Sequence, residues 1–137
     1  MTSMNNASAD SAEQIKKVVL YVEDNPANLR LISQIMERLV DVELVTAHTP
    51  QLGLDIAESR AMDLILLDIN LPGMNGFEML DKLRTIGNYS NVPILAVSAN
   101  AMPGDIEKGL NSGFDEYITK PINIQNFIKT MEGYLKE

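Results

Sequence analysis

Residues 63–80 read DLILLDINLPGMNGFEML, and this stretch decides the fold class. Its apolar run Leu64–Leu67 is typical of a strand that is covered on both faces of a parallel sheet. The run ends at Asp68, a Pro-Gly pair then favours a turn, and Asn75 is a suitable cap for a helix. The stretch therefore predicts a strand, a turn and a helix, with an aspartate at the carboxyl end of the strand.

The same alternation of strand and helix continues on both sides of this stretch. We expect strands at 18–22, 42–47, 64–67, 94–97 and 117–119, and helices that begin near Pro26, Pro50, Asn75, Pro103 and Asn123. Such an alternation forms right-handed βα units, which build a parallel sheet with helices on both faces. The sequence therefore predicts an α/β fold, and sheets of this kind bind ligands at the carboxyl ends of their strands.

The bulk composition fits one soluble globular domain. The chain has 137 residues, of which 45% are hydrophobic and 22% charged, enough for a single core. Its net charge of −8 disfavours binding to nucleic acid or to an anionic membrane, and the absence of cysteine excludes thiolate zinc sites and thiol catalysis. We expect residues 1–15 to be a disordered tail or linker, residues 16–137 to form the domain, and the location to be cytoplasmic.

Polar side chains follow four of the expected strands. Glu23 and Asp24 follow the first strand, Asp68 the third, Ser98 the fourth and Lys120 the fifth. Clustered carboxylates repel one another unless a cation joins them, and an all-oxygen site suits Mg²⁺. An aspartate in this setting can act as a nucleophile and form an acyl phosphate, whose oxygens a lysine and a hydroxyl can hold. The strand ends therefore predict a metal-assisted phosphate site.

These residues, in this order at the strand ends, resemble the receiver domain of response regulators. The stretches VLYVEDNPAN (19–28), DLILLDINLPGMNGFEML (63–80), ILAVSANAMPGD (94–105) and GLNSGFDEYITKPI (109–122) carry the resemblance, which covers roughly residues 17–136. It implies a flavodoxin-like doubly wound sheet with strand order 2-1-3-4-5 and five helices. The phrases VEDNPAN and SANAMPGD favour the receiver of a hybrid histidine kinase over a DNA-binding regulator, and a stand-alone regulator is the other possibility.

The resemblance implies that Asp68 is the phosphoacceptor, with a divalent metal beside it. Mg²⁺, or Mn²⁺, would be bound by Asp24, Asp68 and the backbone carbonyl of Asn70, with Glu23 acting through water. Asn70 and Asn100 would occupy the two variable positions that tune the lifetime of the phosphate. The domain would catalyse only its own phosphorylation and dephosphorylation, so it is not expected to be an enzyme that acts on other substrates.

The resemblance also implies how the phosphoryl group is held and sensed. Its oxygens would be bound by the Ser98 hydroxyl, the Ala99 amide and Lys120, whose peptide bond with Pro121 is usually cis in the family. Tyr117 matches the family's switch aromatic, whose ring turns inward as the hydroxyl residue, here Ser98, moves.

The partners are expected to be proteins. The donor would be a histidine kinase or a histidine phosphotransfer protein, because His48, the only histidine, is interpreted as a surface residue. The signal would pass to a downstream protein through the face formed by the helix at 103–112, the strand at 117–119 and the helix at 123–136. No nucleic acid or membrane partner is expected.

Three other functions remain to be compared with this one. A flavodoxin-like electron carrier would need a first loop that cradles the flavin phosphate, and the acids Glu23 and Asp24 would repel it. A phosphatase with an aspartyl nucleophile commonly has a second acid two residues later, where this chain has Asn70. A receiver-like module that binds partners without phosphorylation would lack site residues, and none is missing.

Overall fold

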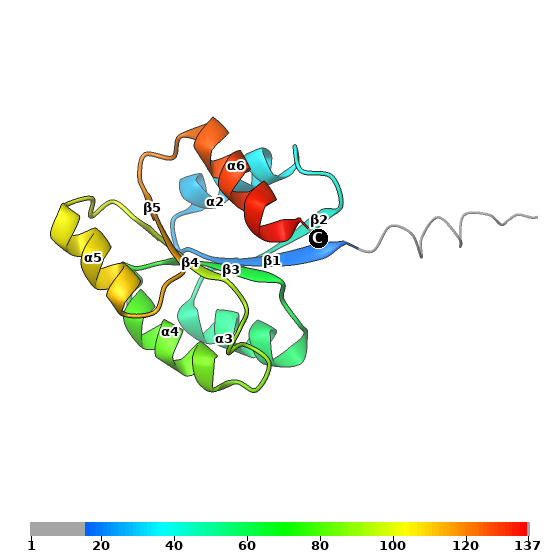
Figure 1. Ribbon diagram of the computed structural model, residues 1–137. Coiled ribbons are helices and arrows are strands. Elements are labelled where there is room, and N and C mark those ends of the chain that lie inside the picture. Colours follow the sequence, from blue (N-terminus) through cyan, green and yellow to red (C-terminus); the bar gives the residue numbers. More distant parts are fainter. Residues whose placement is uncertain (1–15, 137) are drawn as a thin grey trace, which may run out of the picture.

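The computed structural model describes residues 16–136, so the predicted tail at 1–15 lies outside the described residues (Figure 1). The strands are β1 (Lys17–Val22), β2 (Val42–Ala47), β3 (Leu64–Asp68), β4 (Ile94–Ser98) and β5 (Glu116–Thr119), and the helices are α2 (Pro26–Met36), α3 (Pro50–Ser59), α4 (Gly76–Thr85), α5 (Pro103–Asn111) and α6 (Ile124–Leu135). Each predicted element is present, and its predicted start is at or next to the observed one. Within this described part, no helix combines the length and the apolar character needed to cross a lipid bilayer.

The strands form one parallel sheet in the order β2-β1-β3-β4-β5. This order confirms the predicted flavodoxin-like fold. The chain pairs β3 with β1 on one side and with β4 on the other, so that Val22 lies beside Leu67, and Asp68 beside Val97. Because the strands are parallel and nearly in register, their carboxyl ends reach the same edge of the sheet, and the residues that follow them lie close together.

The sheet is the middle of three layers (Figure 1). α2 and α6 cover one face, where Val19, Leu66 and Phe127 are buried in one apolar cluster. α3 and α4 cover the other face, where Leu67 and Met79 belong to a second cluster. The interior of the sheet is therefore apolar on both sides, and charged groups that belong to the central strands are accommodated at the strand ends.

Asparagine caps start the helices on either side of the sheet. The Asn25 side chain accepts hydrogen bonds from the backbone N–H groups of Ala27 and Asn28, and Pro26 occupies the first turn of α2. Asn75 and Glu78 form a reciprocal capping box at the start of α4. These caps satisfy the first N–H groups of each helix and fix the short loops that carry the strand-end residues.

We predict that Gly76→Ala lowers the free energy of unfolding by about 1–3 kcal/mol. A Cβ at Gly76 would lie 2.8 Å from the Ile69 Cα and 3.2 Å from the Asp68 carbonyl oxygen, and neither backbone atom can move aside easily. Urea unfolding followed by circular dichroism measures the change.

The matched control is Gly133→Ala inside α6, where an added Cβ meets nothing within 4 Å. This variant is expected to gain about 0.5–1 kcal/mol, since alanine favours a helix over glycine. Equal stability of Gly76→Ala and the unsubstituted protein would contradict the prediction.

Candidate functional site

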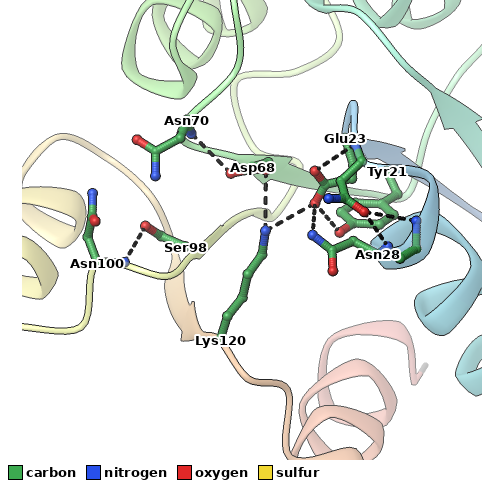
Figure 2. Close-up of polar contacts among 10 residues, drawn as sticks. Tyr21, Glu23, Asn28, Asp68, Asn70, Ser98, Asn100 and Lys120 are labelled. Carbon is green, nitrogen blue, oxygen red and sulfur yellow. Dashed lines mark hydrogen bonds and ion pairs between the residues drawn. The ribbon is translucent and has the colours of Figure 1, made fainter.

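The structure brings the predicted side chains together at the carboxyl edge of the sheet (Figure 2). Glu23 and Asp24 directly follow β1, while Asp68 and Ser98 are the last residues of β3 and β4. Lys120 directly follows β5 and extends its ammonium group toward Asp68 and Glu23. Five side chains from four strands thus meet, although they are distant in the sequence.

Three of these side chains form an acidic cluster that fits a metal ion. Each of Glu23, Asp24 and Asp68 offers a carboxylate oxygen, and these oxygens all lie within 4.8 Å of one another. Glu23 and Asp68 are buried, with 1% and 4% of their surface exposed, whereas Asp24 is open to solvent. Hard cations such as Mg²⁺ prefer oxygen ligands and retain several waters. The donor set and its one open side match that requirement.

Lys120 is the cation that the chain itself supplies to this cluster. Its Nζ lies 3.2 Å from Glu23 Oε1 and 3.3 Å from Asp68 Oδ2, so one ammonium group bridges two buried carboxylates. A single positive charge leaves the pair with net negative charge, which is unfavourable away from bulk water.

The pKa values of Asp68 and Glu23 shift in opposite directions. Burial, reinforced by the Glu23 carboxylate, raises the pKa of Asp68 to about 6, although the Asn70 N–H and Lys120 act against the rise. The pKa of Glu23 stays below its ordinary value, because hydrogen bonds with the Asp68 carboxyl and the Tyr21 hydroxyl outweigh the effect of burial. Without a metal, Asp68 is therefore the carboxyl of the pair that takes up a proton first as the pH falls.

The loops after β3 and β4 have the same local geometry. The backbone N–H of Asn70 donates to Asp68 Oδ1 at 3.0 Å, and that of Asn100 donates to Ser98 Oγ at 3.0 Å. Ser98 is fully buried, whereas Asn70, Ala99 and Asn100 are exposed. Both loops are thus folded back onto the polar side chain that ends their strand, with the next residues facing solvent.

A cavity of about 200 Å³ adjoins these loops and reaches Tyr117. Its lining includes Asn70, Asn100, Lys108 and Tyr117. The Tyr117 hydroxyl donates to the Asn100 carbonyl oxygen at 2.7 Å, and its ring lies so close to Gly109 of α5 that a Cβ there would be 2.5 Å from Cδ2. The ring therefore links β5 to both the β4–α5 loop and α5.

Two smaller expectations can be compared with the structure. The Lys120–Pro121 peptide bond is cis, as the resemblance implied. His48 is exposed, as expected for a surface residue.

Tyr21 and Asn28 are site residues that the sequence analysis missed. The buried Tyr21 hydroxyl donates to Glu23 Oε1 at 2.8 Å, and the Asn28 amide donates to the same oxygen at 3.4 Å. Burial and the neighbouring Glu23 raise the pKa of Tyr21, so its hydroxyl keeps the proton that it donates. A signal was available, because Glu23 directly follows β1 and lies two residues after Tyr21, so an extended chain turns both side chains to the same side.

Comparison with known proteins identifies the family. Residues 19–132 match the response regulator receiver domain. The polar-differentiation response regulator DivK of Brucella anthropi is 37% identical over 119 residues, which cover 87% of this chain and 96% of DivK.

Solved structures agree with this match. The receiver domain of the sensor histidine kinase PA1611 from Pseudomonas aeruginosa, which has a magnesium ion in its active-site cleft, is 29% identical with a TM-score of 0.80, covering 89% of this chain and 99% of that one. A chain of the complex between the Saccharomyces cerevisiae phosphotransfer protein Ypd1 and the receiver domain of Ssk1 is 26% identical with a TM-score of 0.77, covering 87% and 88%. The chain therefore belongs to the response regulator receiver domain family of two-component signalling.

Proposed function

We propose that Asp68 accepts a phosphoryl group from a histidine of a partner protein in a Mg²⁺-dependent reaction. The observation that carries the proposal is the position of Asp68. Its buried carboxylate lies 3.3 Å from Lys120 Nζ and close enough to the Glu23 and Asp24 carboxylates for all three to bind one metal ion. The domain, comprising residues 16–137, would catalyse only its own phosphorylation and dephosphorylation. A cytoplasmic location belongs to the same proposal.

The proposed metal ligands are Asp24, Asp68 and the backbone carbonyl of Asn70, with Glu23 acting through a water molecule. A bound Mg²⁺ or Mn²⁺ would neutralise the carboxylates and the incoming phosphoryl oxygens, which otherwise repel each other. The acidic cluster supports this assignment, because its oxygens are already close enough to share one ion. The magnesium ion in the PA1611 receiver is a further support.

In the proposed step, a carboxylate oxygen of Asp68 attacks phosphorus in line with the bond to the donor nitrogen. The new P–O bond forms as the P–N bond breaks, the electron pair of that bond returns to the imidazole, and an acyl phosphate results. Lys120, the Ser98 hydroxyl and the Ala99 amide hold the phosphoryl oxygens during the transfer. Asn70 and Asn100, exposed at the mouth of the site, would tune how quickly water removes the phosphate.

The proposed output is a shift between two conformations. Movement of Ser98 toward the phosphate would release Tyr117 from its contacts with Asn100 and Gly109. The face formed by α5, β5 and α6 would then change its affinity for a downstream protein. A coupling of about 1–3 kcal/mol would change that affinity roughly 5–150-fold.

The proposed donor is a histidine kinase or a histidine phosphotransfer protein. The complex of Ypd1 with the Ssk1 receiver domain supports this choice, because there a phosphotransfer protein binds a domain with this fold. The net charge of −8 disfavours nucleic acid or an anionic membrane as a partner.

We predict that the protein, incubated with Mg²⁺ and acetyl phosphate, gains one phosphoryl group that hydroxylamine removes, as an acyl phosphate should. Intact-mass spectrometry measures the product. Asp68→Asn and a chelator are each expected to abolish it, whereas Asp55→Asn, the same change at an exposed site on α3, should retain it. A labile phosphate on Asp68→Asn would refute the assignment.

We also predict a pH-dependent gain of stability from Asp68→Asn in the absence of metal. The pKa of Asp68 is raised in the folded state, so the native protein favours the protonated carboxyl, and that contribution is lost as the pH rises through about 6. Asparagine cannot ionise, so the variant's free energy of unfolding lacks this pH dependence. The stability advantage of the variant over the unsubstituted protein should therefore grow by on the order of 2 kcal/mol as the pH rises from about 4 to 7.

Urea unfolding with a chelator present measures this difference. Excess Mg²⁺ should reduce it, because the ion stabilises the ionised carboxylate of the native state. If the difference in unfolding free energy stays constant across the pH range, the pKa of Asp68 is not raised in the folded protein and the prediction fails.

A further inference from the structure

Tyr21 is the one polar side chain among the buried residues of β1. Val19, Leu20 and Val22 are apolar and fully buried, whereas Tyr21, 1% exposed, places its hydroxyl beneath the acidic cluster. The hydroxyl donates to Glu23 Oε1 at 2.8 Å. Packing of the ring in the apolar cluster accounts for its burial, but the phosphoryl step described above does not use the hydroxyl, whose contact with Glu23 needs another explanation.

The hydrogen bonds of Glu23 are distributed unevenly between its two oxygens. Oε1 accepts from the Tyr21 hydroxyl at 2.8 Å, from Lys120 Nζ at 3.2 Å and from the Asn28 amide at 3.4 Å. Oε2 accepts from the backbone N–H of Asn25 at 3.2 Å. Since a carboxylate oxygen has about two lone pairs for hydrogen bonds, Oε1 has one donor more than it needs.

We propose that Tyr21, assisted by Asn28, is a positioning residue that holds the Glu23 carboxylate in place when Lys120 turns to the phosphoryl group. This inference rests on the proposed phosphoacceptor function. A buried carboxylate that loses a charged donor is strongly destabilised unless other donors remain. Tyr21 and Asn28 are those donors, so Lys120 can leave Oε1 without leaving Glu23 unsatisfied.

The same contacts fix Glu23 in the metal site. Figure 2 shows Tyr21 of β1 and Asn28 in the first turn of α2 beside Glu23, and both donate to its carboxylate. The backbone N–H of Asn25, just before that helix, donates to its other oxygen. Groups that hydrogen-bond a residue of a metal site orient it, and their loss commonly lowers metal affinity about 10–100-fold. Tyr21 therefore contributes to metal affinity without contacting the ion.

The test compares Tyr21→Phe with the unsubstituted protein and with Tyr89→Phe. Tyr89 is also 1% exposed and also loses a buried hydroxyl, but its hydroxyl binds the Ala57 carbonyl and the Met62 N–H, near the amino end of β3. Both substitutions keep the aromatic ring, and both are expected to lower the melting temperature. Only Tyr21→Phe is expected to change the metal site.

Isothermal titration calorimetry with Mg²⁺ gives the first readout. Tyr21→Phe should raise the dissociation constant about tenfold, at the lower end of the range for such contacts, whereas Tyr89→Phe should leave it unchanged. The second readout is the rate of phosphorylation by acetyl phosphate at saturating Mg²⁺. Tyr21→Phe should lower this rate severalfold as well, because Lys120 is then needed by Glu23, whereas Tyr89→Phe should not.

The outcomes separate the two proposals. If the unsubstituted protein neither binds Mg²⁺ nor is phosphorylated, the proposed function fails and this inference fails with it. If the unsubstituted protein does both and a folded Tyr21→Phe matches it in affinity and rate, only the positioning role of Tyr21 is refuted.

Asn28→Ala decides the matter if Tyr21→Phe does not fold. Asn28 is half-buried in the first turn of α2, where alanine is well tolerated. Because its hydrogen bond is longer, we expect a smaller rise in the Mg²⁺ dissociation constant, about threefold. An unchanged constant in this variant would overturn the inference in that case.

Discussion

Two carboxylates, Glu23 and Asp68, are buried side by side at the edge of the sheet with one ammonium group between them. Most of the site follows from this constraint. Burying like charges together is unfavourable, so each oxygen needs donors, and the chain supplies them from β1, α2, the loop after β3 and Lys120. The remaining negative charge is what makes the cluster attract a divalent cation, while burial, reinforced by the Glu23 carboxylate, raises the pKa of Asp68.

The fold determines where such a cluster can exist. The strand interiors are apolar on both faces, because helices cover both sides of the sheet. Charged side chains of the central strands therefore lie where the strands end, and parallel pairing brings those ends together. Gly76 keeps the start of α4 against the backbone of Asp68 and Ile69, which fixes the carboxyl end of β3 in the same region. The stability of this edge and the geometry of the site are thus set by the same packing.

The fold and the identity of the strand-end residues could be predicted from the sequence. Apolar runs such as Leu64–Leu67 are local signals, and the caps Asn25 and Asn75 mark helix starts in the residues themselves. The contacts inside the site were harder to predict. Lys120 follows Glu23 by 97 positions, so their hydrogen bond depends on the whole sheet and on the path of the chain after β5.

Tyr21 was missed for a different reason. A tyrosine within a buried strand is usually explained by packing of its ring, and only the position of the hydroxyl shows that it also serves Glu23. The role of Asn28 depends on the angle at which α2 leaves the first loop, which no local pattern of residues specifies. The helices and strands could therefore be predicted from the sequence, whereas the polar contacts between neighbouring elements could be identified only in the three-dimensional structure.

The contact between Tyr117 and Gly109 has a mechanical consequence. The ring occupies the space that a side chain at position 109 would fill, so Gly109 of α5 and the ring of Tyr117 pack directly against each other. If the ring leaves, Gly109 has no side chain to replace the lost packing contacts, and a shift of α5 would be needed to restore them. In the proposed switch, a rotation of one side chain would thereby become a displacement of a helix, without any hydrogen bond having to transmit it.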